Sequence, residues 1–193
     1  VIKLKRRYGY IDKTGSIIIN PQFESAGHFS EGHAAIELGD RWGFIDLTGK
    51  LVINPQFDQA EAFSGGLAAI KLNKRWGFVD KSGKIVIHPQ FEEVGFFVKG
   101  LAPARMGDRW GYVDIAGKLA INPQFDEAGS FSQDLAQVEL ANRWGYINKD
   151  GKYVINPQFD EAAPFADGLA RVKISRKLGY IDDNGRFIWN PAN

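Results

Sequence analysis

Apolar and polar residues alternate in short runs along the chain. Residues 34–38 (Ala-Ala-Ile-Glu-Leu) alternate small or apolar with polar side chains, as a half-buried strand does. Residues 42–46 and 51–53 predict a second and a third strand, and Pro55 is expected to end the third because it lacks a ladder N–H. Residues 34–57 are therefore predicted to form a three-stranded antiparallel meander. Segment 58–66 is expected to connect this meander to the next one as a short strand or a single helical turn.

Turn lengths set the register of this meander and therefore its faces. Residues 39–40 predict a two-residue turn of type II′, and residues 47–49 predict a three-residue turn that ends in a left-handed glycine. This register places Gly43 opposite Ile53. One face is then predicted to be an aliphatic core of Ala34, Ile36, Leu38, Ile45, Leu51 and Ile53. The other face mixes aromatic and polar residues, namely Glu37, Trp42, Phe44, Asp46, Lys50, Val52 and Asn54.

The same pattern returns every 34 residues. An aromatic-Gly-aromatic-aliphatic signature is centred on Gly9, Gly43, Gly77, Gly111, Gly145 and Gly179. A lone meander cannot cover its own core face, so neighbouring units must stack on one another. We expect one repeat domain over residues 1–193, with units 1–34, 35–68, 69–102, 103–136, 137–170 and a partial unit 171–193.

Two architectures fit an all-β tandem repeat of this kind. We favour an open curved array, solenoid-like, in which each meander packs its aliphatic face on the previous unit. The alternative is a six-bladed β-propeller. A period of 34 residues is short for a four-stranded blade, and a ring usually needs a terminal strand to complete a split blade.

The repeated residues resemble the bacterial WG (KWG) repeat family over essentially the whole chain. The match comprises, in order and in phase, Trp-Gly-Phe-Ile-Asp at 42–46, Thr-Gly-Lys at 48–50, Asn-Pro-Gln-Phe at 54–57 and Phe-Ser-Gly-Gly-Leu-Ala at 63–68. The resemblance implies an array of repeats and little chemistry, because such repeats are generally described as arrays of unknown function. Tyr8 and Leu178 replace the Trp, and Trp189 occupies a column of Ile, as expected for terminal units.

Composition narrows the classes of function. Lys and Arg total 24 against 23 Asp and Glu, so the chain lacks the basic excess of a nucleic-acid-binding protein. The absence of cysteine excludes disulfides and thiolate metal sites. No apolar run approaches the ~18 residues of a membrane-spanning helix. The chain begins at Val1 without a signal-like apolar run, so we expect a mature form or a fragment, and composition predicts no compartment.

Almost every polar residue belongs to a repeating column, whereas catalysis needs an asymmetric cluster. Asp46 and its equivalents are expected to cap the turns that follow them. The three histidines, His28, His33 and His88, share no spacing typical of a metal site, and no nucleophile, P-loop or dinucleotide motif is present. We therefore predict no catalytic, cofactor or metal site and no enzymatic activity.

One candidate binding surface is a ladder of aromatic and amide side chains. Each Trp is expected to face the Asn or His of the third strand, so the ladder comprises Trp42, Trp76, Trp110, Trp144, Asn54, His88, Asn122 and Asn156, with Tyr8 preceding Trp42. Aromatic rings beside amides at a regular spacing suit glycans or extended peptides. The alternative is that each Trp packs on an adjacent unit.

A second candidate surface is the third unit, where the symmetry of the repeat breaks. Apolar or otherwise atypical residues occupy columns that elsewhere hold small or polar ones, which predicts a patch for a partner. Its members are Phe96, Val98, Pro103, Arg105 and Met106. The alternative is local repacking around Phe96.

These observations favour a non-catalytic repeat scaffold that binds a protein or peptide partner. One alternative is a glycan- or cell-envelope-binding module that uses the Trp and Asn ladder. Another is a structural element that self-associates end to end through its terminal meanders.

Overall fold

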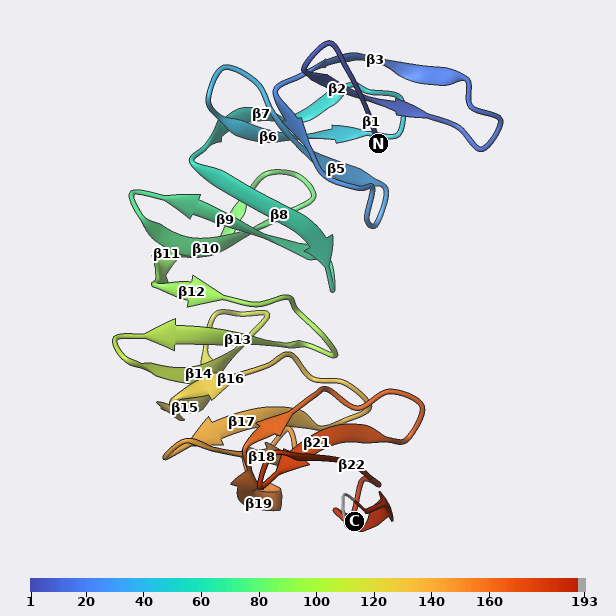
Figure 1. The fold of residues 1–193 in the computed structure, drawn as a ribbon. Helices are drawn as coiled ribbons and strands as arrows, with labels where there is room; N and C mark the ends of the chain where they lie inside the picture. The colour runs from blue at the N-terminus through green and yellow to red at the C-terminus, as the bar shows by residue number, and fades with distance from the viewer. Residues whose placement is uncertain (191–193) are drawn as a thin grey trace. The chain divides into compact units, whose positions relative to one another are not determined.

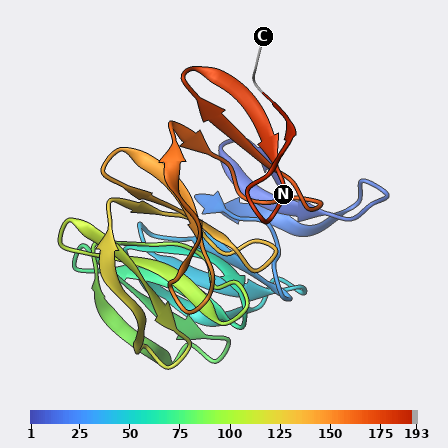
Figure 2. The same cartoon turned by 90° about the horizontal axis from the view of Figure 1, so that it is seen from below.

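The protein consists of β-strands joined by tight turns. A computed structural model describes residues 1–190, and all its regular elements are strands, drawn in Figure 1 and from a second direction in Figure 2. Contacts between residues group the chain into two compact parts, Val1–Glu92 and Glu93–Asn193, called here the N-terminal and C-terminal halves. Each half holds three antiparallel sheets, numbered one to six along the chain. In residues 1–190 no helix is long and apolar enough to cross a membrane.

The N-terminal half contains sheets one to three. Sheet one comprises β1 (Ile2–Leu4), β2 (Arg7–Ile11) and β3 (Ile17–Phe23). Sheet two comprises β4 (Ser25–Ala26), β5 (His33–Glu37), β6 (Trp42–Asp46) and β7 (Leu51–Phe57). Sheet three comprises β8 (Gln59–Ser64), β9 (Leu67–Leu72), β10 (Arg75–Asp80) and β11 (Ile85–Phe91).

The C-terminal half contains sheets four to six. Sheet four comprises β12 (Glu93–Val94), β13 (Leu101–Met106), β14 (Arg109–Asp114) and β15 (Leu119–Phe125). Sheet five comprises β16 (Glu127–Ala128), β17 (Ala136–Leu140), β18 (Arg143–Ile147) and β19 (Tyr153–Phe159). Sheet six comprises β20 (Glu161–Ala162), β21 (Ala170–Ile174), β22 (Lys177–Ile181) and β23 (Phe187–Trp189).

The predicted meander is present in every unit, and the connector adds a fourth strand to it. Sheets two to six each follow the order of the chain, with the connector strand at one edge. Most connector strands have two residues, whereas β8 has six. Segment 58–66 is therefore a strand rather than a helical turn. The choice between an open array and a closed ring stays a prediction.

Both predicted hairpin turns form, with one difference in type. Gly39 and Asp40 have φ angles of 62° and 58°, so the two-residue turn is type I′ rather than type II′. In the next turn Asp46 Oδ1 accepts hydrogen bonds from the backbone N–H groups of Thr48 at 2.9 Å and Lys50 at 3.1 Å. A further hydrogen bond from the Thr48 hydroxyl is the main reason that the pKa of Asp46 lies below its usual value. The predicted role of the Asp column as a turn cap is confirmed.

A bulge changes the register between the second and third strands of the meander. Ile45 lies opposite Leu51, but Phe44 lies opposite Ile53, so the expected pairing of Gly43 with Ile53 is wrong. The third strand also continues through Pro55 instead of ending before it. A Cβ atom on Gly43 would lie 2.5 Å from the carbonyl oxygen of Ile53, because the bulged strand passes directly over this glycine. Glycine is therefore required there by close approach of the backbone.

Sheet two is buried on both faces, not on one. The aliphatic face of sheet two packs on sheet one; this cluster joins Ala34, Ile36 and Ile45 to Tyr10, Ile19 and Phe23. The aromatic face of sheet two packs on sheet three; this cluster joins Phe44, Ile53 and Phe57 to Ala68, Ile70 and Val79. Leu38 and Leu51, predicted to be core, are 40% and 38% exposed. Within each half, a sheet thus packs its aromatic face on the aliphatic face of the sheet that follows it.

An ion pair between an arginine and an acid recurs in each of the five full units. Arg41 pairs with Asp58, and the second carboxylate oxygen of Asp58 accepts the N–H of Asn73 at 2.9 Å, in the β9–β10 turn. The same spacing of 17 residues recurs in four further pairs, Arg7–Glu24, Arg75–Glu92, Arg109–Asp126 and Arg143–Asp160. The arginine column thus lies at the surface, and each member is paired with an acid.

Candidate functional site

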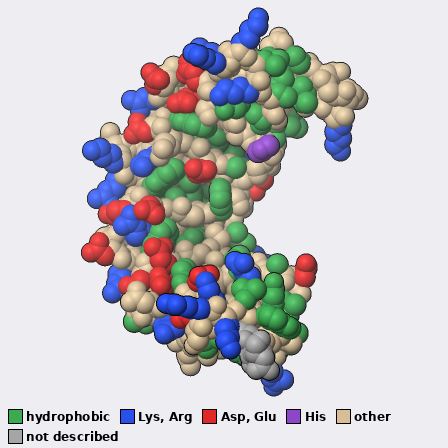
Figure 3. Space-filling view, in the orientation of Figure 1, with side chains coloured by type: hydrophobic (Ala, Val, Ile, Leu, Met, Phe, Trp, Pro, Cys, Tyr) green, Lys and Arg blue, Asp and Glu red, His purple; other side chains and the backbone are tan. Residues whose placement is uncertain are grey.

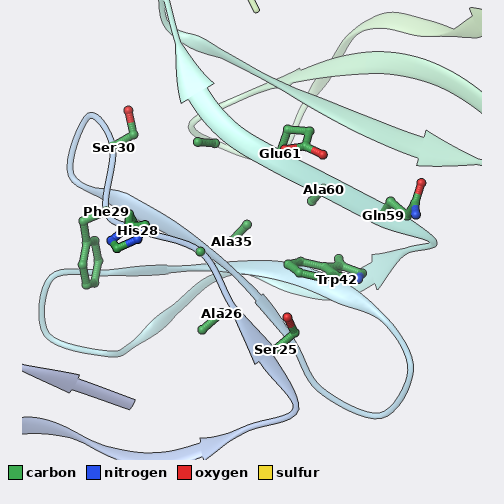
Figure 4. A pocket seen from close by; sticks show the side chains of 12 residues that line it. Ser25, Ala26, His28, Phe29, Ser30, Ala35, Trp42, Gln59, Ala60 and Glu61 are labelled. Atoms are coloured by element: carbon green, nitrogen blue, oxygen red, sulfur yellow. The ribbon is translucent and has the colours of Figure 1, made fainter. Parts of the chain in front are cut away.

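A groove lies between the edges of sheets two and three in the N-terminal half. Its cavity volume is about 380 Å³, within the range of small ligand sites. One wall is β4 with the segment that follows it, residues 25–30, and the other wall is residues 59–62 of β8. Figure 4 shows Ala35 and Trp42 on the sheet-two side of this space and Ala60 on the facing strand. We call this space the β4–β8 groove.

The groove is open because the residue at its floor is small. Ala35 of β5 lines the cavity, and Pro103, Gln137 and Arg171 hold the same repeat column in the C-terminal half. In sheets four and five the larger side chains of this column, Pro103 and Gln137, fill the space beside the connector glycine. In sheet five, for example, a Cβ on Gly129 would lie only 2.2 Å from the amide nitrogen of Gln137.

Polar side chains mark the walls of the groove. His28 lies on the sheet-two wall, and Gln59 and Glu61 lie on the β8 wall. Glu61 stands in a column that is otherwise Gly27, Gly95, Gly129 and Ala163. Pairing of β8 with β9 is interrupted between Ala60 and Phe63, so Glu61 lies in an irregular part of the strand. The arrangement gives an apolar floor between an imidazole and a carboxylate.

One end of the groove is fixed by contacts between sheets two and three. The Ser30 hydroxyl donates to the carbonyl of Phe63 at 2.7 Å. Glu31 accepts the N–H of Gly66 at 3.1 Å and pairs with Lys81 at 3.0 Å. The hydrogen bond from Lys81 is the main reason that the pKa of Glu31 is lowered. These contacts hold the two walls at a set distance, so the groove is preformed.

The same repeat columns line a smaller cavity in the C-terminal half. Its volume is about 120 Å³, and its lining on sheet six includes Ala162, Ala163 and Leu178. These residues are the equivalents of Ala26, Gly27 and Trp42. A cavity therefore forms beside the connector strand in both sheets two and six, and the side chains around it determine its volume.

The Trp and Asn ladder is not assembled as predicted. Trp42 lies opposite Phe57 rather than Asn54, and Trp76, Trp110 and Trp144 likewise lie opposite the Phe of the Asn-Pro-Gln-Phe motif. The amide and imidazole side chains of the ladder, Asn54, His88, Asn122 and Asn156, are exposed. Trp110 is buried in the core of its half, and the Lys71 ammonium lies over the ring of Trp76 at 5.2 Å. Trp42 is the ladder member that lines the β4–β8 groove.

The predicted patch in the third unit is divided by the structure. Phe96 is 45% exposed and Met106 is 38% exposed, but they lie at opposite ends of the β12–β13 pair. Pro103 is buried, and Val98 packs against the core cluster of sheets four and five. Arg105 pairs with Glu93 across the two strands. Whether any of the five residues contacts a partner stays a prediction.

Sequence reasoning missed the groove, although the signal was present. Comparing the repeat columns singles out Glu61, whose column elsewhere holds glycine or alanine, and shows that the column of Ala35 and Ala69 holds larger residues in the later units. Neither residue adds an apolar side chain, whereas extra apolar side chains are the reason that the third unit was predicted as a partner patch. The signal for the groove is instead a small residue, Ala35, together with a polar residue, Glu61, in a column of glycine and alanine.

Solved structures with a similar fold are distant in sequence. Hsv2 from Kluyveromyces lactis is 10% identical, with a TM-score of 0.53 over 83% of this chain and 61% of that chain. The dihydro-heme d1 dehydrogenase NirN is 13% identical, with a TM-score of 0.54 over 91% and 48%. A eukaryotic initiation factor is 13% identical, with a TM-score of 0.53 over 84% and 50%. These neighbours are propeller-like folds, the alternative architecture above, and the likeness shows the fold alone.

Sequence comparison identifies the repeat itself. No curated protein matches the chain. The sequence model of the WG-containing repeat matches five consecutive segments, residues 8–42, 42–76, 76–110, 110–144 and 144–177. These segments cover most of the chain and share the 34-residue spacing of the glycine column. The chain therefore belongs to the family of WG-containing repeats.

Proposed function

We propose that this chain is a non-catalytic scaffold that binds an extended peptide segment of a partner protein in the β4–β8 groove. The observation that carries the proposal is a preformed cavity of about 380 Å³ bordered on both sides by edge strands of consecutive sheets. An edge strand presents backbone N–H and C=O groups, to which an extended peptide can add as a further strand.

The lining of the groove defines the peptide that would suit it. Ala35, Ala60 and Trp42 offer a shallow apolar floor, which accommodates a short apolar side chain. Glu61 on the wall suits a basic side chain or a hydrogen-bond donor at a neighbouring position. Because the side chains of an extended peptide alternate in direction, one residue would enter the floor and its neighbour would reach the wall.

A glycan is the second candidate ligand for the same groove. The half-buried ring of Trp42 beside the polar side chains of His28 and Glu61 favours it, since sugars stack on aromatic rings and hydrogen-bond to polar neighbours. In both cases the site binds and does not react. The proposal of a non-catalytic role rests on the repeat columns, which account for almost every other polar side chain.

The test is a ligand screen followed by a block of the groove. A random peptide library and a glycan array are screened against the intact chain, and the affinity of each hit is measured by calorimetry. Ala62→Phe places in the groove wall the residue that Phe96 supplies in the same repeat column, so the fold should accept it. We expect this variant to weaken peptide binding by at least about tenfold, or roughly 1.4 kcal/mol.

The matched control is Pro164→Phe, an exposed position of the same column on sheet six, away from the groove. It should leave the affinity unchanged. Equal affinities for the wild type and Ala62→Phe would refute the groove as the site. If the screens find a glycan and no peptide, and Ala62→Phe but not Pro164→Phe abolishes glycan binding, the glycan would replace the peptide as the proposed ligand.

A further inference from the structure

In three places a tyrosine hydroxyl caps a backbone carbonyl just beyond the connector strand that follows it. The Tyr10 hydroxyl donates to the carbonyl of Gly27 at 2.9 Å. The same hydrogen bond forms twice in the C-terminal half, at 2.8 Å from Tyr112 to Gly129 and at 2.7 Å from Tyr146 to Ala163. Donor and acceptor are 17 residues apart each time, so this hydrogen bond is a feature of the repeat.

Sheet two carries phenylalanine in the same repeat column, beside the β4–β8 groove. This residue is Phe44, and 17 residues further along the chain is Glu61 on the β8 wall (Figure 4). The ring centroids of Phe44 and Phe63 lie 4.9 Å apart, and those of Tyr112 and Phe131, in the same columns, lie 5.0 Å apart. The Phe44 ring therefore has the usual position, and only the hydroxyl is missing.

The ladder between β8 and β9 is interrupted at the same residue. Pairing stops at Ala60 and resumes at Phe63, so no residue of β9 is paired with Glu61. Among residues 1–190 the Glu61 carbonyl thus has neither a ladder partner nor a tyrosine donor, and it can accept a hydrogen bond from a ligand. Acidic and apolar side chains lie beside each other at the surface over β8 in Figure 3.

We propose that the main-chain carbonyl of Glu61 is the anchor of the groove and accepts a backbone N–H from an extended peptide of a partner protein. The inference rests on the proposed function, and it adds that Phe44 keeps this acceptor open. Backbone hydrogen bonds at a sheet edge supply affinity for any sequence, whereas the Glu61 carboxylate and the apolar floor select side chains. Where the column holds tyrosine, the protein's own hydroxyl fills the acceptor.

Phe44→Tyr tests this inference, because its hydroxyl should cap the Glu61 carbonyl as that of Tyr112 caps Gly129. The probe is a blocked peptide of alternating valine and arginine, which matches the floor and the wall of the groove. Calorimetry should show that the variant binds this peptide at least about fivefold more weakly than the wild type. Phe78→Tyr is the matched control, since Phe78 holds the same column in sheet three and does not line the groove. It should leave the affinity unchanged.

A second measurement needs no peptide. Thermal unfolding should show that Phe44→Tyr melts about 2–4 °C above the wild type, because an open carbonyl gains a donor. Tyr112→Phe removes such a donor and should lower the melting temperature by a similar amount. A melting temperature for Phe44→Tyr at or below that of the wild type would overturn the inference, with or without peptide binding.

The binding results separate this inference from the proposed function. Weaker binding by Phe44→Tyr and by Ala62→Phe, but not by Phe78→Tyr, would support both. Weaker binding by Ala62→Phe alone would overturn the carbonyl anchor and leave the groove as the site. A wild type that does not bind the probe, or binding that Ala62→Phe leaves unchanged, would contradict the proposed function and the anchor with it.

Discussion

At the scale of single residues, the glycine of the Trp-Gly signature determines how the meander closes. A Cβ at Gly43 would lie 2.5 Å from the oxygen of Ile53 and 2.7 Å from the nitrogen of Pro55. Backbone atoms cannot move aside as the end of a side chain can. Glycine is therefore required in this column by close packing of the backbone and not by the conformation of a turn.

Gly43→Ala tests this requirement. The added methyl group forces β6 and β7 apart, and we expect a loss of about 1–3 kcal/mol in the free energy of unfolding by urea. Gly27→Ala is the matched control, because the nearest atom to its added Cβ is 3.7 Å away. That substitution should be neutral or stabilise by up to about 1 kcal/mol. Similar losses for both variants would contradict the role assigned to Gly43.

Residue identity also explains why the sequence does not predict the groove directly. Aromatic and apolar side chains are typical of binding surfaces, so they favour the aromatic ladder and the third unit. The groove instead depends on the small Ala35 and on Glu61, whose column elsewhere is glycine or alanine. A cavity is made by missing volume, and a sequence shows that only when the repeat columns are compared.

At the scale of elements, turn chemistry predicted the meander but not its full register. The three-residue turn determines the pair Ile45 and Leu51, and a bulge then shifts every later pair. Because one residue of slip reverses the faces, Ile53 lies with Phe44 and not with Ile45. The connector was predicted as either a short strand or a single helical turn, because two-residue strands, as in most units, are too short to show alternation. The buried second face follows from stacking, which a single unit cannot reveal.

Adjacent positions of β7 test this register. Ile53→Asp places an unpaired carboxylate among Phe44, Phe57 and Ala35, and we expect a loss of about 3 kcal/mol or more in unfolding free energy. The same substitution at Val52, which is 37% exposed, should change stability by no more than about 0.5 kcal/mol. Urea denaturation of both variants measures the difference. Equal losses at the two positions would show that the faces are assigned incorrectly.

At the scale of the whole molecule, the sequence predicted the period, the all-β class and the family. These three properties follow from residues that recur at the same position of every unit, and the structure and the family match confirm them. The binding partner is not predicted in this way, because a binding site depends on residues that depart from the repeat pattern. The stacking of sheets within each half implies that each unit is completed by its immediate neighbour.

Removal of the last unit is the most direct test of that claim. A fragment of residues 1–170 keeps Phe165, whose ring lies 4.8 Å from that of Tyr146, but loses Val172 and Ile181 from the same cluster. If units interact only with their neighbours, thermal unfolding followed by circular dichroism should show an intact strand signal and a modestly lower melting temperature. A fragment that is wholly unfolded at room temperature would contradict the account, because stability would then depend on the complete set of sheets, as in a closed ring.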